Sequence, residues 1–375
     1  MSIKMRNINK DIELNQDVNQ ELNKHESATH TIKQLILIFA VFLLFALTVL
    51  IFLKTDFLNY LIGFGEPRNL NATIINLPQL KNSSFGSVQQ FYPNMKFNHN
   101  NLSYLIHSEC PNDKKESMIE AFNLILQDTG IINFTSVSEN EFADKGESDS
   151  SPVSSNPNDY QGFADIEILC SPEEKASSIQ ESDFFIAGEG GAKEIIQTGR
   201  YNVITRGVIL LYGNPQNAIH CNWPNTEVHE LVHVFGFNHS YNKESLMYPY
   251  LSSCDQKLDD SIINELVRLY SQPNLPDFYF ENVSAVKKGR YLDFNITIRN
   301  SGDVKATNIS YSIVDNGKVI DTNELENLNY GAGIVLEVNN VKLLNRDSKD
   351  IKIVIDYYNH IPEIDKANNV ARLSF

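Results

Sequence analysis

One short run, T-E-V-H-E-L-V-H-V-F-G-F-N-H-S at residues 226–240, constrains this chain more than any other feature of its sequence. His229 and His233 are four residues apart, so on a helix both side chains project from the same face. His239 lies six residues further on and would not reach them if the helix continued straight. Gly236 has no Cβ and can take a positive φ, which would end the helix and fold His239 back. The spacing therefore predicts three imidazoles gathered around one point.

Three imidazole ligands with one open position are typical of a catalytic zinc site, because a structural site is closed by a fourth protein ligand. Glu230 lies between two of the predicted ligands and is expected to point toward the open position. Zinc lowers the pKa of a bound water to about 7, and a neighbouring carboxylate can take the proton as that water attacks a carbonyl. The pattern indicates a metal-dependent hydrolase of peptide bonds with Glu230 as the general base.

Met247 follows His239 by eight residues, within S-L-M-Y-P-Y. The pattern H-E-x-x-H-x-x-G-x-x-H and this methionine resemble the signature and Met-turn of the metzincin zinc peptidases, and H-S followed by S-L-M-Y-P is most similar to the matrixin branch. F-A-D-I-E-I-L, A-G-E-G-G (187–191) and the segment 258–270 also resemble matrixin stretches. The resemblance implies an α+β zincin-like (metzincin) catalytic domain over residues 93–272, one catalytic Zn²⁺, supporting roles for Gly236 and Met247, and protein or peptide substrates.

The sequence departs from the family pattern in several places. Tyr248 and Tyr250 follow Met247 by one and three positions, so the M-x-Y tyrosine ligand of astacin-like relatives is not expected. No cysteine precedes Cys110, so the cysteine switch of many matrixins is not expected either. No histidine lies between residues 140 and 219, which removes the ligands of the family's structural zinc. Structural Ca²⁺ in the 144–162 loop is not supported, because a solvated acidic loop is the favoured interpretation.

The segment Leu35–Leu53 is apolar except for Thr48 and is long enough to cross a bilayer as a helix. We expect one N-terminal transmembrane helix over residues 34–54, after a flexible cytoplasmic tail over residues 1–33 and before a stalk or linker over residues 55–92. A cleaved signal peptide and a buried core helix are the alternatives. Lysine and arginine residues before the span modestly outnumber those soon after it, which favours an N-terminus inside the cell.

The four cysteines all follow the predicted span, and their even number suits an oxidising compartment, with free thiols as the alternative. Cys221 precedes the predicted active-site helix and Cys254 follows the Met-turn, so we expect these two to pair. Cys110 and Cys170 would then join two strands of the sheet. Several Asn-x-Ser/Thr sequons agree weakly with an outward-facing domain. We therefore expect a single-pass protein of the cell membrane whose catalytic and C-terminal domains lie outside.

Apolar periodicity predicts helices over residues 115–127, 226–235 and 258–270 and strands over 102–107, 163–170 and 203–212, with Asn225 or Thr226 capping the second helix. After two prolines at 273 and 276 the pattern changes to short alternating stretches, which predict an all-β, Ig-like sandwich over residues 277–375. This part resembles the CARDB domain of prokaryotic surface proteins. The resemblance implies a binding or spacer module with a ligand at the cell surface.

A net charge of −16 makes nucleic acid an improbable partner. The leading hypothesis is a membrane-anchored zinc endopeptidase that acts on extracellular or cell-surface proteins. One alternative is an adhesion or binding protein with a catalytically silent zincin domain, and the presence of Glu230 argues against it. A further alternative is a quality-control protease that faces the cytoplasm, which requires the opposite topology.

Overall fold

The computed structural model describes residues 33–50, 67–77, 89–139, 164–172, 175–176, 185–213 and 221–374. The chain divides into two compact units, one built mainly of residues 1–67 and the other of residues 68–287 and 291–375. The predicted cytoplasmic tail up to residue 32, the end of the predicted span and the acidic 144–162 loop lie outside the described residues.

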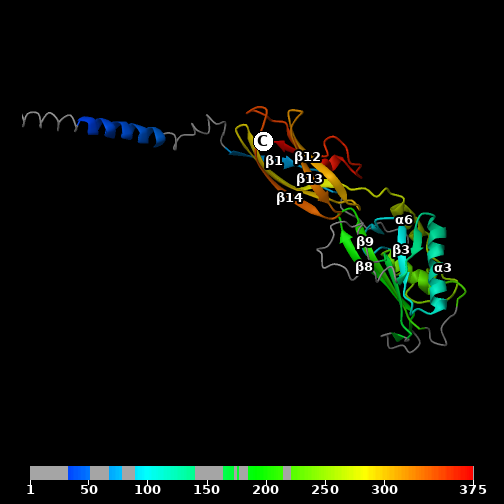
Figure 1. Ribbon diagram of the computed structural model, residues 1–375. Coiled ribbons are helices and arrows are strands. Elements are labelled where there is room, and N and C mark those ends of the chain that lie inside the picture. The colour runs from blue at the N-terminus through cyan, green and yellow to red at the C-terminus, as the bar shows by residue number, and fades with distance from the viewer. Residues whose placement is uncertain are drawn as a thin grey trace, which may run out of the picture. The chain divides into compact units, whose positions relative to one another are not determined.

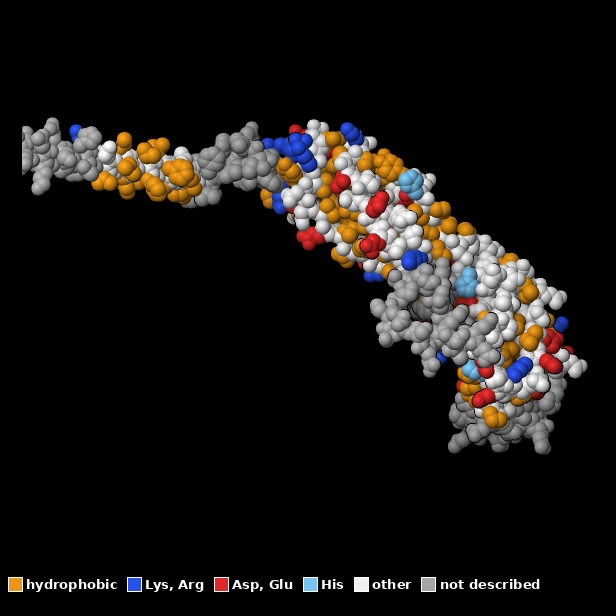
Figure 2. All heavy atoms as spheres, in the orientation of Figure 1, with side chains coloured by type: hydrophobic (Ala, Val, Ile, Leu, Met, Phe, Trp, Pro, Cys, Tyr) orange, Lys and Arg blue, Asp and Glu red, His pale blue; other side chains and the backbone are white. Residues whose placement is uncertain are grey.

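The first unit contains a helix over Lys33–Leu50 with a mean hydropathy of 2.5, and none of its residues is buried against the rest of the protein. Its apolar side chains are exposed, and they cover the visible face of the helix in Figure 2. By length and composition this helix fits a membrane span. A signal sequence near the N-terminus can have the same length and composition.

The segment that carries the histidine motif folds around a mixed sheet in the order β2-β9-β5-β3-β4, with β8 antiparallel to β9 and the other pairs parallel. The strands are β2 Met95–Phe97, β3 Asn101–Ile106, β4 Asn133–Ser136, β5 Ile166–Cys170, β8 Gly188–Gln197 and β9 Asn202–Leu211, with a separate pair, β6 Lys175–Ala176 and β7 Phe185–Ile186. The helices are α3 Asn112–Thr129, α5 Asn225–Val234 and α6 Asp260–Tyr270. The described part of this domain is α+β, and Figure 1 shows α3 beside β3.

Helix α5, which carries the histidine motif, packs directly on the sheet. Gly207 of β9 makes this possible, because a Cβ there would come within 2.4 Å of Cγ1 of Val234. Phe122 of α3 stacks on Tyr104 of β3 with ring centroids 4.3 Å apart, which closes the core on the neighbouring strand. Helix α5 therefore packs on the same apolar core as α3 and the sheet.

Of the two predicted ends of α5, the C-terminal end is confirmed and the N-terminal cap is not. The expected cap at Asn225 or Thr226 is wrong: Pro224 is the N-cap, and no side chain caps the helix. Proline suits the start of a helix because the first N–H groups have no partner inside it. At the other end Gly236 takes φ +85° and stops the helix, as predicted.

The C-terminal domain is an all-β sandwich, and its pairs β1–β16, β11–β14, β12–β13, β12–β15 and β15–β16 are antiparallel. Its strands are β10 Phe278–Lys288, β11 Tyr291–Asn300, β12 Ala306–Asp315, β13 Lys318–Leu328, β14 Gly333–Lys342, β15 Ile351–Ile355 and β16 Val370–Ser374, with a short 3-10 turn, η2, over Ala367–Asn369. Side chains of β10 and β11 share one core with those of β12, β15 and β16, and Phe294 meets Tyr311 edge to face. The alternating pattern predicted this class.

An eighth strand of the sandwich comes from the predicted stalk. Residues 67–73 form β1 (Pro67–Thr73), which lies between β16 and β10 in the strand order and pairs with β16. Leu70 of β1 is 6% exposed and belongs to the sandwich core. No strand was predicted in the stalk or linker, yet residues 67–73 form one. The reason is that its partners, β16 and β10, lie far along the chain, so the strand has no local signal in the sequence. The domain that carries the histidine motif is therefore inserted between the first and second strands of the sandwich.

Charged and polar side chains join the two domains of the second unit. Lys96 of β2 is fully buried, and its Nζ lies 2.8 Å from Oδ2 of Asp303 and 2.7 Å from Oδ1 of Asn274. Nε of Arg200 donates to Oδ2 of Asp277 at 2.9 Å. A buried lysine is costly unless it is paired, so this pairing requires the two domains to stay together.

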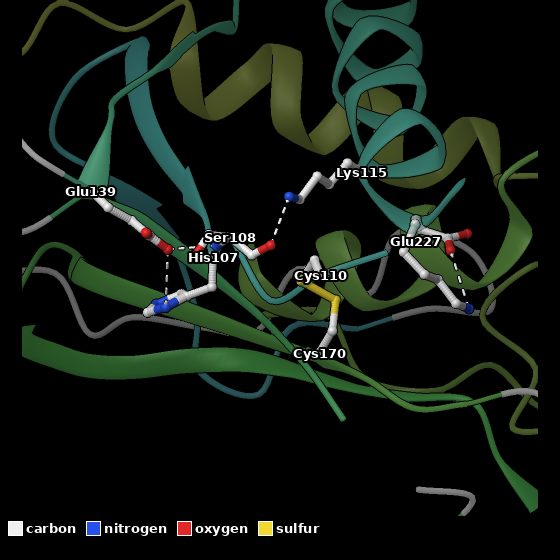
Figure 3. The surroundings of a disulfide bond; sticks show 8 residues. His107, Ser108, Cys110, Lys115, Glu139, Cys170 and Glu227 are labelled. Atoms are coloured by element: carbon white, nitrogen blue, oxygen red, sulfur yellow. Dashed lines mark hydrogen bonds and ion pairs between the residues drawn. A yellow bond between two sulfur atoms is a disulfide. The ribbon is translucent and has the colours of Figure 1, made fainter. Parts of the chain in front are cut away.

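Both predicted disulfide pairings are present, but the first joins the turn after β3 to β5 and not two strands, because Cys110 lies beyond the end of β3. Cys110, just before α3, is bonded to Cys170 at the end of β5, as Figure 3 shows. Cys221, before α5, is bonded to Cys254, which follows the Met-turn. The described residues contain no free cysteine. Two closed disulfides favour an oxidising compartment for this unit.

Candidate metal centre

The three motif histidines converge on one point. The Nε2 atoms of His229 and His233 are 3.1 Å apart, those of His233 and His239 are 3.1 Å apart, and those of His229 and His239 are 3.3 Å apart. Among the histidine, cysteine and acidic side chains of the described residues, these three form the group whose ligand atoms lie close enough together to hold a metal ion. The positive φ of Gly236 is what brings His239 back to the helix.

Main-chain carbonyls orient two of the rings. Nδ1 of His229 donates to the carbonyl of Leu246 and Nδ1 of His233 to that of Phe237, each at 2.7 Å, with the protons assigned to Nδ1 because a carbonyl can only accept. Each Nε2 then presents a lone pair to the shared point. Burial lowers the pKa of His229 to about 3 and that of His233 to about 4, and it also lowers the pKa of His239. Neutral imidazole is the form that binds a metal.

The donor set fits zinc. Nitrogen ligands about 2.0–2.1 Å from a tetrahedral ion are roughly 3.3–3.4 Å from one another, close to the separations of the three Nε2 atoms. Three lone pairs directed at one another with no cation between them would repel. The arrangement therefore fits one divalent ion with a fourth position left for a non-protein ligand.

Glu230 is a residue of helix α5, and the edge strand β8 passes against it. Burial raises the pKa of its carboxyl to about 8, and the main-chain N–H of Gly190 donates a hydrogen bond to it, which acts in the opposite direction. The strand passes very close: a Cβ on Gly190 would lie 2.2 Å from the carbonyl oxygen of Glu230, and one on Gly188 would lie 2.7 Å from its Cγ. Glycines at 188 and 190 thus permit β8 to lie on the glutamate.

Met247 is fully buried, and the turn around it is organised by Gln256. Nε2 of Gln256 lies within hydrogen-bonding distance of the carbonyls of Lys243, Ser245 and Tyr250, and its Oε1 accepts the N–H of Ser252. Gln256 is 4% exposed, so these groups pair away from water. Its role was missed in the sequence because a glutamine between polar residues carries no periodic signal.

Two segments of the chain match known families. Residues 180–271 match the family model described as Matrixin, and residues 275–372 match the CARDB model. The first match is to a family of metallopeptidases, and the second covers the all-β sandwich. No curated protein matches the sequence.

Solved structures similar to the chain are CARDB domains and cover its C-terminal part. A domain of a Methanosarcina acetivorans protein is 19% identical and covers 27% of this chain and 90% of its own, with a TM-score of 0.23. The CARDB domain of a Pyrococcus furiosus protein, solved in complex with two metal ions, is 16% identical and covers 27% of this chain and 93% of its own, also with a TM-score of 0.23.

Proposed function

We propose that the protein is a membrane-anchored, zinc-dependent endopeptidase that hydrolyses peptide bonds of extracellular or cell-surface proteins. The observation that carries the proposal is the convergence of three Nε2 atoms within 3.1–3.3 Å of one another, with a buried glutamate directly after the first of these histidines in the sequence. His229, His233 and His239 would hold the zinc ion. Glu230 would be the catalytic residue.

When bound, the zinc ion would supply a Lewis acid and lower the pKa of a water in its open position. Glu230 would take the proton of that water on a carboxylate oxygen and pass it to the nitrogen of the leaving amine. The N–H of Gly190 would keep the carboxylate aimed during this transfer. In the described part of the chain β8 pairs on one side only, with β9, so its other edge can accept an extended substrate by main-chain hydrogen bonds.

Cleavage by the purified full-length protein tests the proposal. The protein would be prepared in detergent micelles, loaded with zinc and assayed against a quenched peptide library, with Glu230→Gln as the matched variant. Glutamine keeps the size of the side chain but cannot take a proton, so we expect cleavage to fall by about 10³-fold or more while zinc content is unchanged. Equal turnover by the two proteins would refute the proposal, and it would favour a binding role for a silent zincin domain.

The topology requires its own experiment. We propose that the N-terminus lies inside the cell and both folded domains outside, and the lysine bias before the helix and the two disulfides support this. A protease added to intact cells should degrade an epitope placed after residue 375. An epitope that is protected in intact cells and degraded only after lysis would place the domains in the cytoplasm.

A further inference from the structure

A short segment that leads from the sandwich into the catalytic-type domain lies against the metal centre. This approach segment, residues 89–92, pairs with the turn between His233 and His239. The N–H of Phe91 donates to the carbonyl of Gly236 at 2.8 Å, and the N–H of Asn238 donates to the carbonyl of Gln89 at 2.8 Å. Gln90 and Phe237 are antiparallel bridge partners. The turn that positions the third histidine is therefore held from outside the motif.

The side chain of Gln90 fixes the approach segment further. Its Nε2 donates to the carbonyls of Met95 and Phe235, at 2.8 and 3.1 Å, and its Oε1 accepts the N–H of Met95 at 3.0 Å. These bonds join the approach segment to the start of β2 and to the end of α5. The backbone on either side of Phe91 therefore has a defined position.

Phe91 places an apolar ring beside a predicted metal ligand. Its ring centroid is 6.2 Å from that of His233, at an interplanar angle of 32°. The residue is nevertheless 50% exposed, and the neighbouring Tyr92 is 48% exposed. A half-exposed phenylalanine on a segment held by main-chain hydrogen bonds keeps apolar surface in water, which a partner would bury favourably. The ring is beside the metal centre and is accessible there.

We infer that the approach segment forms one wall of the substrate cleft and that Phe91 is a specificity-determining residue. It would contact an apolar side chain of the substrate on the side of the scissile bond that lies over His233. The preferred substrates would then be proteins with a large aliphatic or aromatic residue at that position. This inference rests on the proposed function.

The test compares Phe91→Ala with Phe91→Leu in the full-length, zinc-loaded protein. Peptides that differ in one residue on either side of the scissile bond would be ranked by kcat/KM. We expect Phe91→Ala to lose on the order of tenfold against peptides with a large apolar residue at one position and little against peptides with alanine there. Phe91→Leu should recover most of the loss. Zinc content and the unfolding midpoint should match the unsubstituted protein.

Peptide binding in a Glu230→Gln background gives a second measurement that needs no turnover. The same peptides should bind about tenfold more weakly when Phe91→Ala is added, again only where the apolar residue is present. Equal losses for all peptides, or a loss of zinc, would show that Phe91 is only structural and overturn the inference. Absence of cleavage together with a Phe91-dependent preference in binding would count against the proposed function and leave the subsite standing.

Discussion

The main-chain N–H of Ser240 donates a 2.7 Å hydrogen bond to the carbonyl of Met247. Ser240 directly follows the third histidine, so this bond joins the metal centre to the turn that carries the buried methionine. Anything that loosens that turn should therefore also disturb His239.

Gln256 offers the most direct test of that link. In Gln256→Leu the carbonyls of Lys243, Ser245 and Tyr250 lose their shared donor in a buried site. We expect the free energy of unfolding to fall by about 2–4 kcal/mol and zinc to bind more weakly, measured by denaturant titration and competition with a chelator. Gln256→Glu keeps an acceptor for Ser252 but removes the donors, so it should be impaired as well. A fully stable glutamate variant would contradict this account.

Gly190 should not tolerate even one added methyl group. Because its Cβ would lie 2.2 Å from the carbonyl oxygen of Glu230, Gly190→Ala has to displace β8 or α5. We expect kcat/KM to fall by at least tenfold, since positioning errors near 1 Å cost that much or more. Gly191→Ala is the matched control, because no atom lies within 4 Å of the Cβ it would add. Similar activities for the two variants would rule out a steric requirement at position 190.

Leu70 tests whether the strand before the catalytic-type domain supports the sandwich. Leu70→Ala would leave a cavity in a core where the residue is 6% exposed, and we expect a loss of about 2–4 kcal/mol in the free energy of unfolding. Ile75 is 50% exposed, so Ile75→Ala should cost little. Thermal unfolding of the two variants gives the comparison, and equal midpoints would show that β1 is dispensable.

Glu363 should make the stability of the sandwich depend on pH. Burial raises the pKa of its carboxyl from 4.5 to about 7, although the N–H of Phe278 and the side-chain amide of Asn369 donate to it. A carboxyl with a raised folded-state pKa favours folding most below its unfolded pKa, and the contribution is lost as the pH rises toward 7. Glu363→Gln should flatten the decline in unfolding free energy between pH 5 and 7. Parallel curves for the two proteins would contradict the assignment.

Most of the candidate metal centre was predictable from sequence, because the meeting of its three histidines depends on local spacing. Two histidines four residues apart on a helix and a glycine that ends it determine where three imidazoles meet, and the structure brings them together. The sandwich was predictable for a similar reason, since alternation of period two is local. Its first strand was not, because residues 67–73 are held by neighbours far along the chain, β16 and β10, and leave no local pattern in the sequence.

The supporting groups of the site were also beyond sequence analysis. Gln256 and Gln90 act through side-chain hydrogen bonds to main-chain carbonyls, and such contacts follow from the path of distant segments. The family resemblance singled out the glycines of A-G-E-G-G. The close approach of Gly190 to the main chain of Glu230 depends on how β8 packs against α5, which the sequence does not specify locally.

The insertion of the catalytic-type domain behind β1 has a mechanical consequence. A pull on the chain from the N-terminal helix reaches β1 first, and the hydrogen bonds of that strand to its neighbours would carry the load before it arrived at Gln89 and the histidine turn. The sandwich would then protect the candidate metal centre from a force applied at the N-terminal helix. If the N-terminal helix anchors the protein in a membrane as proposed, one cut before residue 67 would release the sandwich and the peptidase-type domain together.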